Sequence, residues 1–279
     1  MNTWQLMLST WNFEPSVVFG CGCLLLGYVV YLRAMQPPHS ALRIPHSAFL
    51  YAAGVGVLLF SLTSPLDTLG DTYLFSAHML QHLLLVLVVP PLLLLGLPSG
   101  VGGQPPYRRR LGGQWSGVAW GIGVGTLWVW HLPVLFDATL RNEWVHVFEH
   151  LCFLASATVF WWPIVGPVAH LGQRSLSAPA AAIYLFAASL ANDMLGILIT
   201  FAPPGLYAPY LHPVDWLGVL PLLRDGWGLT PAVDQQVAGL LMWIPGNLVY
   251  LAAILAQLAR WYGETGGDGM ALSPQMEEV

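Results

Sequence analysis

The chain has 279 residues, of which 56% are hydrophobic and 8% are charged, and its net charge is −5. Soluble domains contain roughly 25% charged residues, so this composition excludes a soluble globular domain and indicates an integral membrane protein. The basic residues are all arginines, and without a lysine the chain cannot form a retinal-type Schiff base.

Seven apolar windows follow one another along the chain, separated by Gly, Pro and charged residues. A bilayer core of about 30 Å needs about 20 apolar residues in a helix. The fold class we predict is all-α: a polytopic membrane protein with a bundle of seven transmembrane helices. The windows lie near 16–34, 47–64, 72–96, 115–133, 144–165, 178–201 and 234–261. Pro90 and Pro91 should kink the third span.

The arginines are distributed unequally between the two sides of the predicted bundle. Only Arg141 and Arg224 fall on the side where spans three and five begin. The positive-inside rule therefore predicts that the N-terminus is outside and the C-terminus cytoplasmic. The seven arginines on the other side are Arg33, Arg43, Arg108, Arg109, Arg110, Arg174 and Arg260.

The two ends of the chain carry further expectations. No Lys or Arg precedes the first span, so we expect that span to be retained rather than cleaved as a signal peptide. We divide the chain into a transmembrane domain over 1–262 and a disordered cytoplasmic tail over 263–279. The outer segment 202–233, rich in Pro, Gly and aromatic residues, is too long for a simple connection and is a candidate lid or docking surface.

Two stretches, HMLQH at 78–82 and HVFEH at 146–150, place histidines four residues apart on the third and fifth spans. Residues at i and i+4 share one helix face, so each pair can bind one ion from one side. Both spans begin on the same side of the membrane, because an even number of crossings separates their starts. The two pairs are therefore expected to face a common outer-leaflet site.

Rise per residue places six polar groups in that leaflet. Each ionisable group there costs about 2.5–3.5 kcal/mol, which makes it a functional candidate. The six are His78, His82, His131, His146, His150 and Asp193. A single transmembrane histidine more often makes an interhelical hydrogen bond, and for His131 the two interpretations are balanced. The two pairs together favour a metal site.

Other side chains are candidates for accessory roles. Glu149 precedes His150, and Asn192 precedes Asp193. The carboxylates of Glu149 and Asp193 could each bind a metal. We favour instead a role in which each orients an imidazole by accepting its second N–H. Soft Cu(I) ligands could also come from methionine, although a buried methionine is more commonly a packing residue. The methionines concerned are Met79, Met194 and Met242.

The chemistry favours copper among transient cargoes, because the site is rich in imidazole and faces the cell envelope. Three alternatives remain open. Bis-histidine haem binding would leave the second histidine of each pair without a role. A di-iron oxygenase needs about eight histidines in three HxxxH-type boxes. This sequence has two such boxes and one further histidine within the predicted spans. A proton-coupled transporter would use Asp193 as a relay, yet no clear path continues into the inner leaflet.

Four phrases resemble the CtaG family of cytochrome c oxidase assembly factors, seven-helix bacterial membrane proteins. They are SPLDTLGDTYLFSAHMLQHLLL (64–85), WHLPVLFDATLRNEWVHVFEHLCFLAS (130–156), ANDMLGILITF (191–201) and DQQVAGLLMWIPGNLVYL (234–251). The residues that match the family's motifs are His78, His82, His131, His146, His150, Asp193 and Asp234–Gln236.

That resemblance implies a multi-pass protein of the bacterial inner membrane that helps to mature the haem-copper oxidase. We expect a non-enzymatic metallochaperone that supplies copper to the oxidase catalytic subunit. An extracytoplasmic copper donor and the lipid bilayer are its other expected partners, and no nucleic acid is among them. Asp234, which matches the motif, joins the candidate accessory residues.

Overall fold

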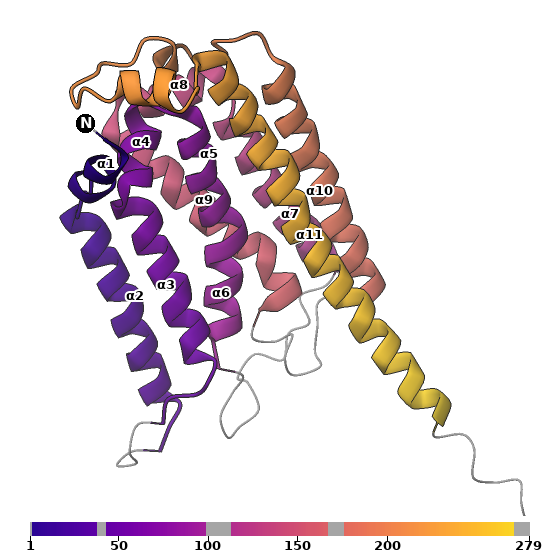
Figure 1. Ribbon diagram of the computed structural model, residues 1–279. Coiled ribbons are helices and arrows are strands. Elements are labelled where there is room, and N and C mark those ends of the chain that lie inside the picture. The colour runs from indigo at the N-terminus through magenta and orange to yellow at the C-terminus, as the bar shows by residue number, and fades with distance from the viewer. Residues whose placement is uncertain (1, 38–42, 99–112, 167–175, 271–279) are drawn as a thin grey trace, which may run out of the picture.

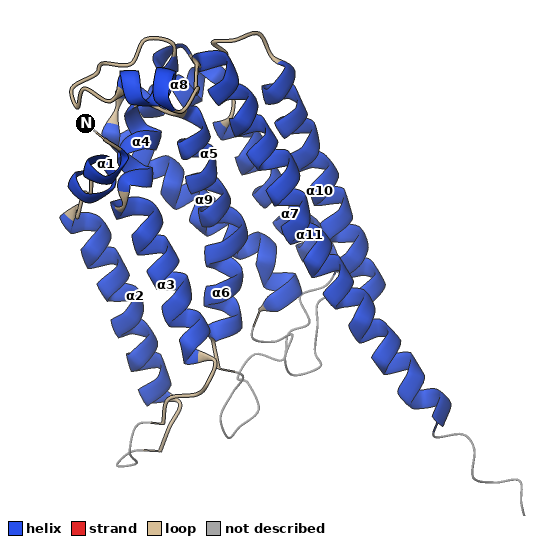
Figure 2. Ribbon diagram, in the orientation of Figure 1, coloured by secondary structure: helices blue, strands red, loops and turns tan. Residues whose placement is uncertain are grey.

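The computed structural model describes residues 2–37, 43–98, 113–166 and 176–270. Within those ranges the regular elements are helices and none is a strand (Figure 2). Most of the helices run side by side through one bundle (Figure 1). The all-α prediction is therefore confirmed.

Among the described residues, five segments are long and apolar enough to cross a membrane alone. They are α2 (Pro15–Ala34), the segment Phe75–Gly96, α9 (Glu143–Val165), α10 (Ala178–Phe201) and α11 (Pro231–Met270). Two bent helix pairs raise the number to seven if each pair is one span. The start of the chain and the far end of α11 lie at opposite ends of the bundle (Figure 1), as an odd number of crossings requires. The direction relative to the cytoplasm stays a prediction.

The bent pairs are α3 (Ala48–Thr63) with α4 (Pro65–Thr72), at 47°, and α7 (Gly113–Trp130) with α8 (Pro133–Arg141), at 69°. A proline begins the second helix of each pair. Proline fits the first turn of a helix and disfavours helical backbone in the residue before it. The chain therefore turns at Ser64 and at Leu132, and α4 and α8 form helices in stretches for which the sequence predicted none.

The third span is divided by its prolines, as predicted. It consists of α5 (Phe75–Leu83), the π-helix η1 (Leu84–Val88) and α6 (Val89–Gly96). Pro90 has no N–H to donate to the carbonyl of Val86, and the indole Nε1 of Trp161 on α9 donates to that oxygen instead, at 2.9 Å. This hydrogen bond connects the interrupted part of the third span to α9.

The short elements gather at one end of the bundle. Helix α1 (Thr3–Ser9) begins with a capping box formed by Asn2 and Gln5. Between α10 and α11 lie the 3₁₀ turn η3 (Ala208–Tyr210) and the π turn η4 (Leu222–Gly226). Figure 1 shows α1, α4, α8 and the segment that connects α10 to α11 at the same end. That end is where α5 and α9 begin.

Helices α10 and α11 pack closely through glycine. A Cβ added to Gly239 would collide with Thr200 Oγ1 and would lie 2.6 Å from the backbone nitrogen of Thr200. Small residues are the usual means by which membrane helices approach this closely. Large apolar side chains such as Leu198 and Leu255 are exposed on the outside of these helices. The protein is thus a multi-pass membrane protein with apolar surfaces available to lipid.

The predicted tail begins inside a helix. Helix α11 continues to Met270, and residues 271–279 lie outside the described residues. Of the arginines counted for orientation, Arg108, Arg109, Arg110 and Arg174 also lie outside the described residues. The orientation and the domain boundary at 262 both remain predictions.

Candidate metal centre

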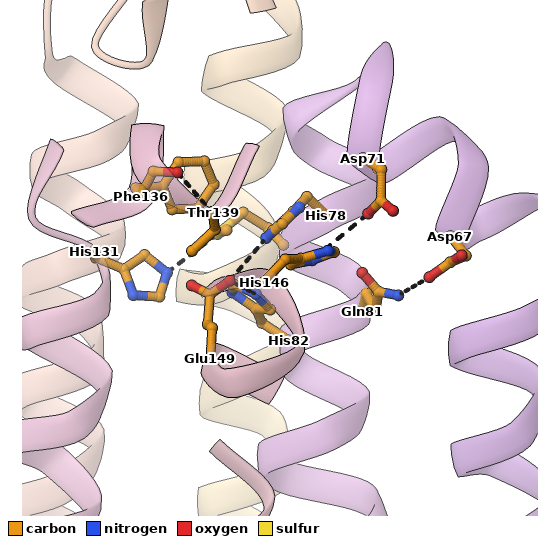
Figure 3. A network of polar contacts seen from close by, with 12 residues as sticks. Asp67, Asp71, His78, Gln81, His82, His131, Phe136, Thr139, His146 and Glu149 are labelled. Atoms are coloured by element: carbon orange, nitrogen blue, oxygen red, sulfur yellow. Dashed lines mark hydrogen bonds and ion pairs between the residues drawn. The ribbon is translucent and has the colours of Figure 1, made fainter. Parts of the chain in front are cut away.

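The two histidine pairs face each other across the interface between α5 and α9. Figure 3 shows His78 and His82 of α5 beside His146 of α9. The ring centroids of His78 and His146 are 5.3 Å apart, and those of His82 and His150 are 5.8 Å apart. Four-residue spacing places each pair on one helix face. The structure therefore brings the imidazoles of two separate spans together, at the end where both helices begin.

One ligand atom from each of four residues lies within 4.8 Å of the other three. The four are His78, His146, Glu149 and His150, and we call them the histidine–glutamate cluster. Glu149 lies among the imidazoles: its Oε2 is 3.8 Å from His78 Nε2 and 3.7 Å from His82 Nε2. The sequence interpretation favoured Glu149 as an orienting residue, whereas the geometry places its carboxylate where a ligand would be.

The polar atoms of this cluster are buried and unsatisfied. Among the described residues, both ring nitrogens of His78, both carboxylate oxygens of Glu149 and Nε2 of His150 have no hydrogen-bond partner. A buried polar group without a partner costs about 1–3 kcal/mol. The donor set, three imidazoles and a carboxylate from two helices, suits a divalent or monovalent transition-metal ion. A cation bound at this position would satisfy one ligand atom of each of the four residues.

Helix α4 supplies a second carboxylate at the edge of the cluster. Asp71 Oδ1 lies 3.6 Å from His146 Nε2. Gly70 permits this approach, because a Cβ there would lie 3.0 Å from the backbone nitrogen of His78. No pattern in the sequence indicates a role for Asp71, because the bend that turns α4 against α5 is not evident from it. Asp71 is placed to orient His146 in the way that was expected of Asp193 and Glu149.

A second polar pair lies behind Asp71. The amide of Gln81 donates to Asp67 Oδ1 at 2.8 Å and to the carbonyl of Ser61 at 2.9 Å (Figure 3). Gln81 is fully buried, so these hydrogen bonds hold α5 against α3 and α4. The sequence offered no signal for this pair beyond its polar residues.

The segment 202–233 covers the end of the bundle above the cluster (Figure 1). The hydroxyl of Tyr207 donates to the carbonyl of His131 at 2.8 Å, and that of Tyr210 donates to the carbonyl of Gly70 at 2.6 Å. Both rings also pack against Phe136. Burial raises the pKa of both tyrosines, so the hydroxyls remain protonated donors. The segment thus has the position expected of a lid.

His131 is close to the cluster but faces a different partner. Its ring centroid is 5.6 Å from that of His82. Its Nδ1 lies 2.7 Å from the carbonyl of Leu127, and its Nε2 lies 3.3 Å from Met79 Sδ. His131 and His82 are therefore neighbours of the four clustered ligand atoms rather than members of that group.

Asn192 and Asp193 connect α10 to α11 instead of joining the cluster. The amide of Asn192 donates to the carbonyl of Met242 at 2.7 Å, and Asp193 Oδ2 accepts from Asn247 Nδ2 at 2.9 Å. The expectation that Asp193 orients an imidazole has no support in these contacts. Rise per residue predicts a depth for Asp193 but not the direction of its side chain.

Asp234, at the start of α11, holds the start of α5. Its carboxylate accepts from the backbone N–H groups of Phe75 at 2.8 Å and Ser76 at 3.1 Å, and also from the Ser76 hydroxyl. These are the unpaired donors of a helix N-terminus. Asp234 therefore positions the helix that bears His78.

Replacing Asp234 with alanine is expected to destabilise the protein by about 2–3 kcal/mol, because buried donors at the start of α5 lose their acceptor. Thermal unfolding in detergent measures the loss. The matched control is Asp225→Ala, which changes an exposed carboxylate in the neighbouring segment. Equal unfolding temperatures for Asp234→Ala and wild type would contradict the capping role.

His46 and His212 lie in turns or loops outside this cluster, and His39 and His170 lie outside the described residues. The fold and the site together define a class: a multi-pass helical membrane protein with a buried histidine–carboxylate cluster near one end of its bundle. Comparison with known proteins makes the identification specific.

The chain belongs to the family of cytochrome c oxidase caa3 assembly factors (Caa3_CtaG), which matches residues 26–264. An uncharacterized protein of Mycobacterium leprae is 28% identical over 275 residues, and one of Mycobacterium bovis is 25% identical over 279 residues. Each alignment covers 91% of this chain, and the chain spans 40% of the length of those relatives. No solved structure matches. Membership confirms the family resemblance seen in the sequence.

Proposed function

We propose that this protein acts in the assembly of a haem-copper cytochrome c oxidase by binding copper and delivering it to the catalytic subunit. It does so as a metallochaperone and not as an enzyme. Family membership supports the assembly role. The copper role rests on one observation: three imidazoles and one carboxylate converge from two helices, and several of their ligand atoms are buried without a hydrogen-bond partner among the described residues.

The ligands of this site favour a metal ion that is released to another protein over one that is stored. The four clustered residues include no thiolate, and thiolates are the soft ligands that hold copper and zinc most firmly. Imidazole and carboxylate ligands must be deprotonated to bind, so protonation competes with the metal for these atoms. Such a site gives up its ion more readily than a cysteine site does.

The less buried side of the cluster indicates where copper enters and leaves. The side chains of His78 and Glu149 are fully buried, whereas the side chain of His146 is 12% exposed and that of Asp71 is 37% exposed. The ion therefore passes between Asp71 and His146, at the end covered by α4 and the segment 202–233. A copper donor and the oxidase would both meet the protein at this end.

The test is copper binding by the purified full-length chain. Copper per chain, measured by mass spectrometry after loading and dialysis, is expected to fall by at least about tenfold in the double variant His78→Ala, His82→Ala, which removes both imidazoles of α5. The matched control, His46→Ala with His212→Ala, removes two histidines outside the cluster and should bind as the wild type does. Unchanged stoichiometry in the first variant would overturn the proposal.

X-ray absorption on the loaded protein separates the proposal from its rivals. Copper bound by the cluster is expected to show three imidazole nitrogens and one carboxylate oxygen. A Soret band in the purified protein would instead identify a haem protein. Iron in place of copper would favour the oxygenase alternative.

A further inference from the structure

Met79 and His131 form a contact that neither packing nor hydrogen bonding explains. Both side chains are buried, with relative exposures of 0% and 4%. Met79 Sδ and His131 Nε2 are 3.3 Å apart, and the other ring nitrogen, Nδ1, is 2.7 Å from the carbonyl of Leu127. The two side chains come from α5 and from the end of α7.

The Leu127 carbonyl fixes the tautomer of His131. A carbonyl oxygen only accepts, so Nδ1 bears the proton, and in a neutral imidazole Nε2 is then an unprotonated acceptor. The thioether of Met79 is also an acceptor. Two lone pairs therefore face each other with no proton between them. A second proton on this imidazole would place a cation at a depth where charge costs about 2.5–3.5 kcal/mol.

A soft metal ion fits between these two atoms. With bond lengths of the kind found at zinc, about 2.0 Å to nitrogen and about 2.3 Å to sulfur, an ion that bridges a 3.3 Å separation subtends about 100°. That angle leaves room for further ligands on the open side. Thioether and imidazole together select monovalent copper over harder ions.

Two further donors, His82 and Met242, line a small cavity that adjoins Met79. Its lining also includes apolar residues and Asn192. Met242 on α11 is 2% exposed. Met194, the third methionine of these spans, is 54% exposed and lies outside the cavity.

We propose that Met79, His131 and Met242, with His82, form a second coordination position that selects monovalent copper, next to the histidine–glutamate cluster. His82 lies between the two positions, because its Nε2 is 3.7 Å from Glu149 and its side chain also lines the cavity. An ion can therefore pass from one position to the other without leaving the protein. This inference rests on the proposed copper-binding function and assigns it a second set of ligands.

Selenium provides the direct test. The full-length chain is produced with selenomethionine at its 8 methionines, loaded with Cu(I) under reducing conditions, and examined at the selenium and copper absorption edges. The expected result is a copper neighbour at bonding distance from selenium, which an ion held only by the cluster would not give. Selenium without a copper neighbour overturns the proposal, whether or not Cu(I) is retained.

Leucine variants give an independent measure. Met79→Leu with Met242→Leu keeps the side-chain volume and removes both thioethers. Its Cu(I) affinity, measured by competition with a chromogenic Cu(I) chelator, is expected to fall by about 10–100-fold. The matched control Met194→Leu should leave the affinity unchanged. Equal affinities for the double variant and the control would also overturn the second position.

The two proposals fail in different ways. Loss of Cu(II) and Ni(II) binding in His78→Ala, with the copper–selenium contact retained, supports both positions as separate sites. Normal binding of these divalent ions by a wild type that shows no copper–selenium contact removes the second position alone. A wild type that binds neither Cu(I) nor divalent ions removes both.

Discussion

Replacing Glu149 with glutamine is expected to lower copper affinity by about 100-fold or more. Outer-shell partners of a metal site contribute roughly 10–100-fold, and Glu149 supplies the one carboxylate among the clustered ligand atoms. The substitution keeps the shape of the side chain but replaces an anionic oxygen with a neutral amide. Copper binding to the purified chain, measured by competition with a chelator, gives the loss.

If Glu149 had only a structural role, replacing it would lower the stability of the unloaded protein. A ligand role predicts no such loss. Its carboxylate oxygens accept no hydrogen bond from the described residues, so removing the charge should leave the unloaded protein at least as stable as the wild type. The matched control is Glu143→Gln, an exposed carboxylate two turns earlier on the same helix. Wild-type affinity in Glu149→Gln, or a loss of equal size in Glu143→Gln, would exclude the carboxylate as a ligand.

A large loss of stability is expected from Gly239→Ala. The added methyl group would lie 2.6 Å from the backbone nitrogen of Thr200, and backbone cannot move aside as a side chain can. Overpacking of this kind costs about 1–3 kcal/mol, and sometimes more. Displacing α11 would also move Asp234 and, through it, the start of α5. Thermal unfolding should therefore occur at lower temperature, and copper affinity should fall with it.

Gly125→Ala on α7 is the matched control for that substitution. A Cβ there meets nothing within 4 Å. Alanine is also the better helix former, by roughly 0.5–1 kcal/mol, so this variant should unfold at the same temperature as the wild type or higher. If both glycine variants unfolded alike, the close approach of α10 and α11 would not contribute to stability.

The sequence predicted what depends on periodicity along one helix. Runs of apolar residues located the spans, and four-residue spacing predicted that His78 and His82 share a face, as do His146 and His150. Because an even number of membrane crossings separates the starts of these two spans, both faces were expected at the same end of the bundle. Each of these inferences needs only helix geometry and the membrane thickness.

The remainder of the site depends on contacts between segments, which one-dimensional patterns do not encode. Asp71 reaches His146 because α3 and α4 bend by 47° at Ser64 and because Gly70 has no side chain. The rotation of Asp193 about the axis of α10, which rise per residue does not predict, directs it to Asn247. The contact between Met79 and His131 likewise depends on how α5 and α7 are rotated.

The π turn in the third span has a consequence for how this protein can vary. Each residue of a helix adds about 100° of rotation, so one deletion within Leu84–Val88 would swing the histidine-bearing half away from α9 while the apolar half stayed in place. Aliphatic residues can replace one another in this stretch. Its length cannot change without turning the histidines of α5 away from α9, so a deletion here should lower copper binding more than an aliphatic substitution does.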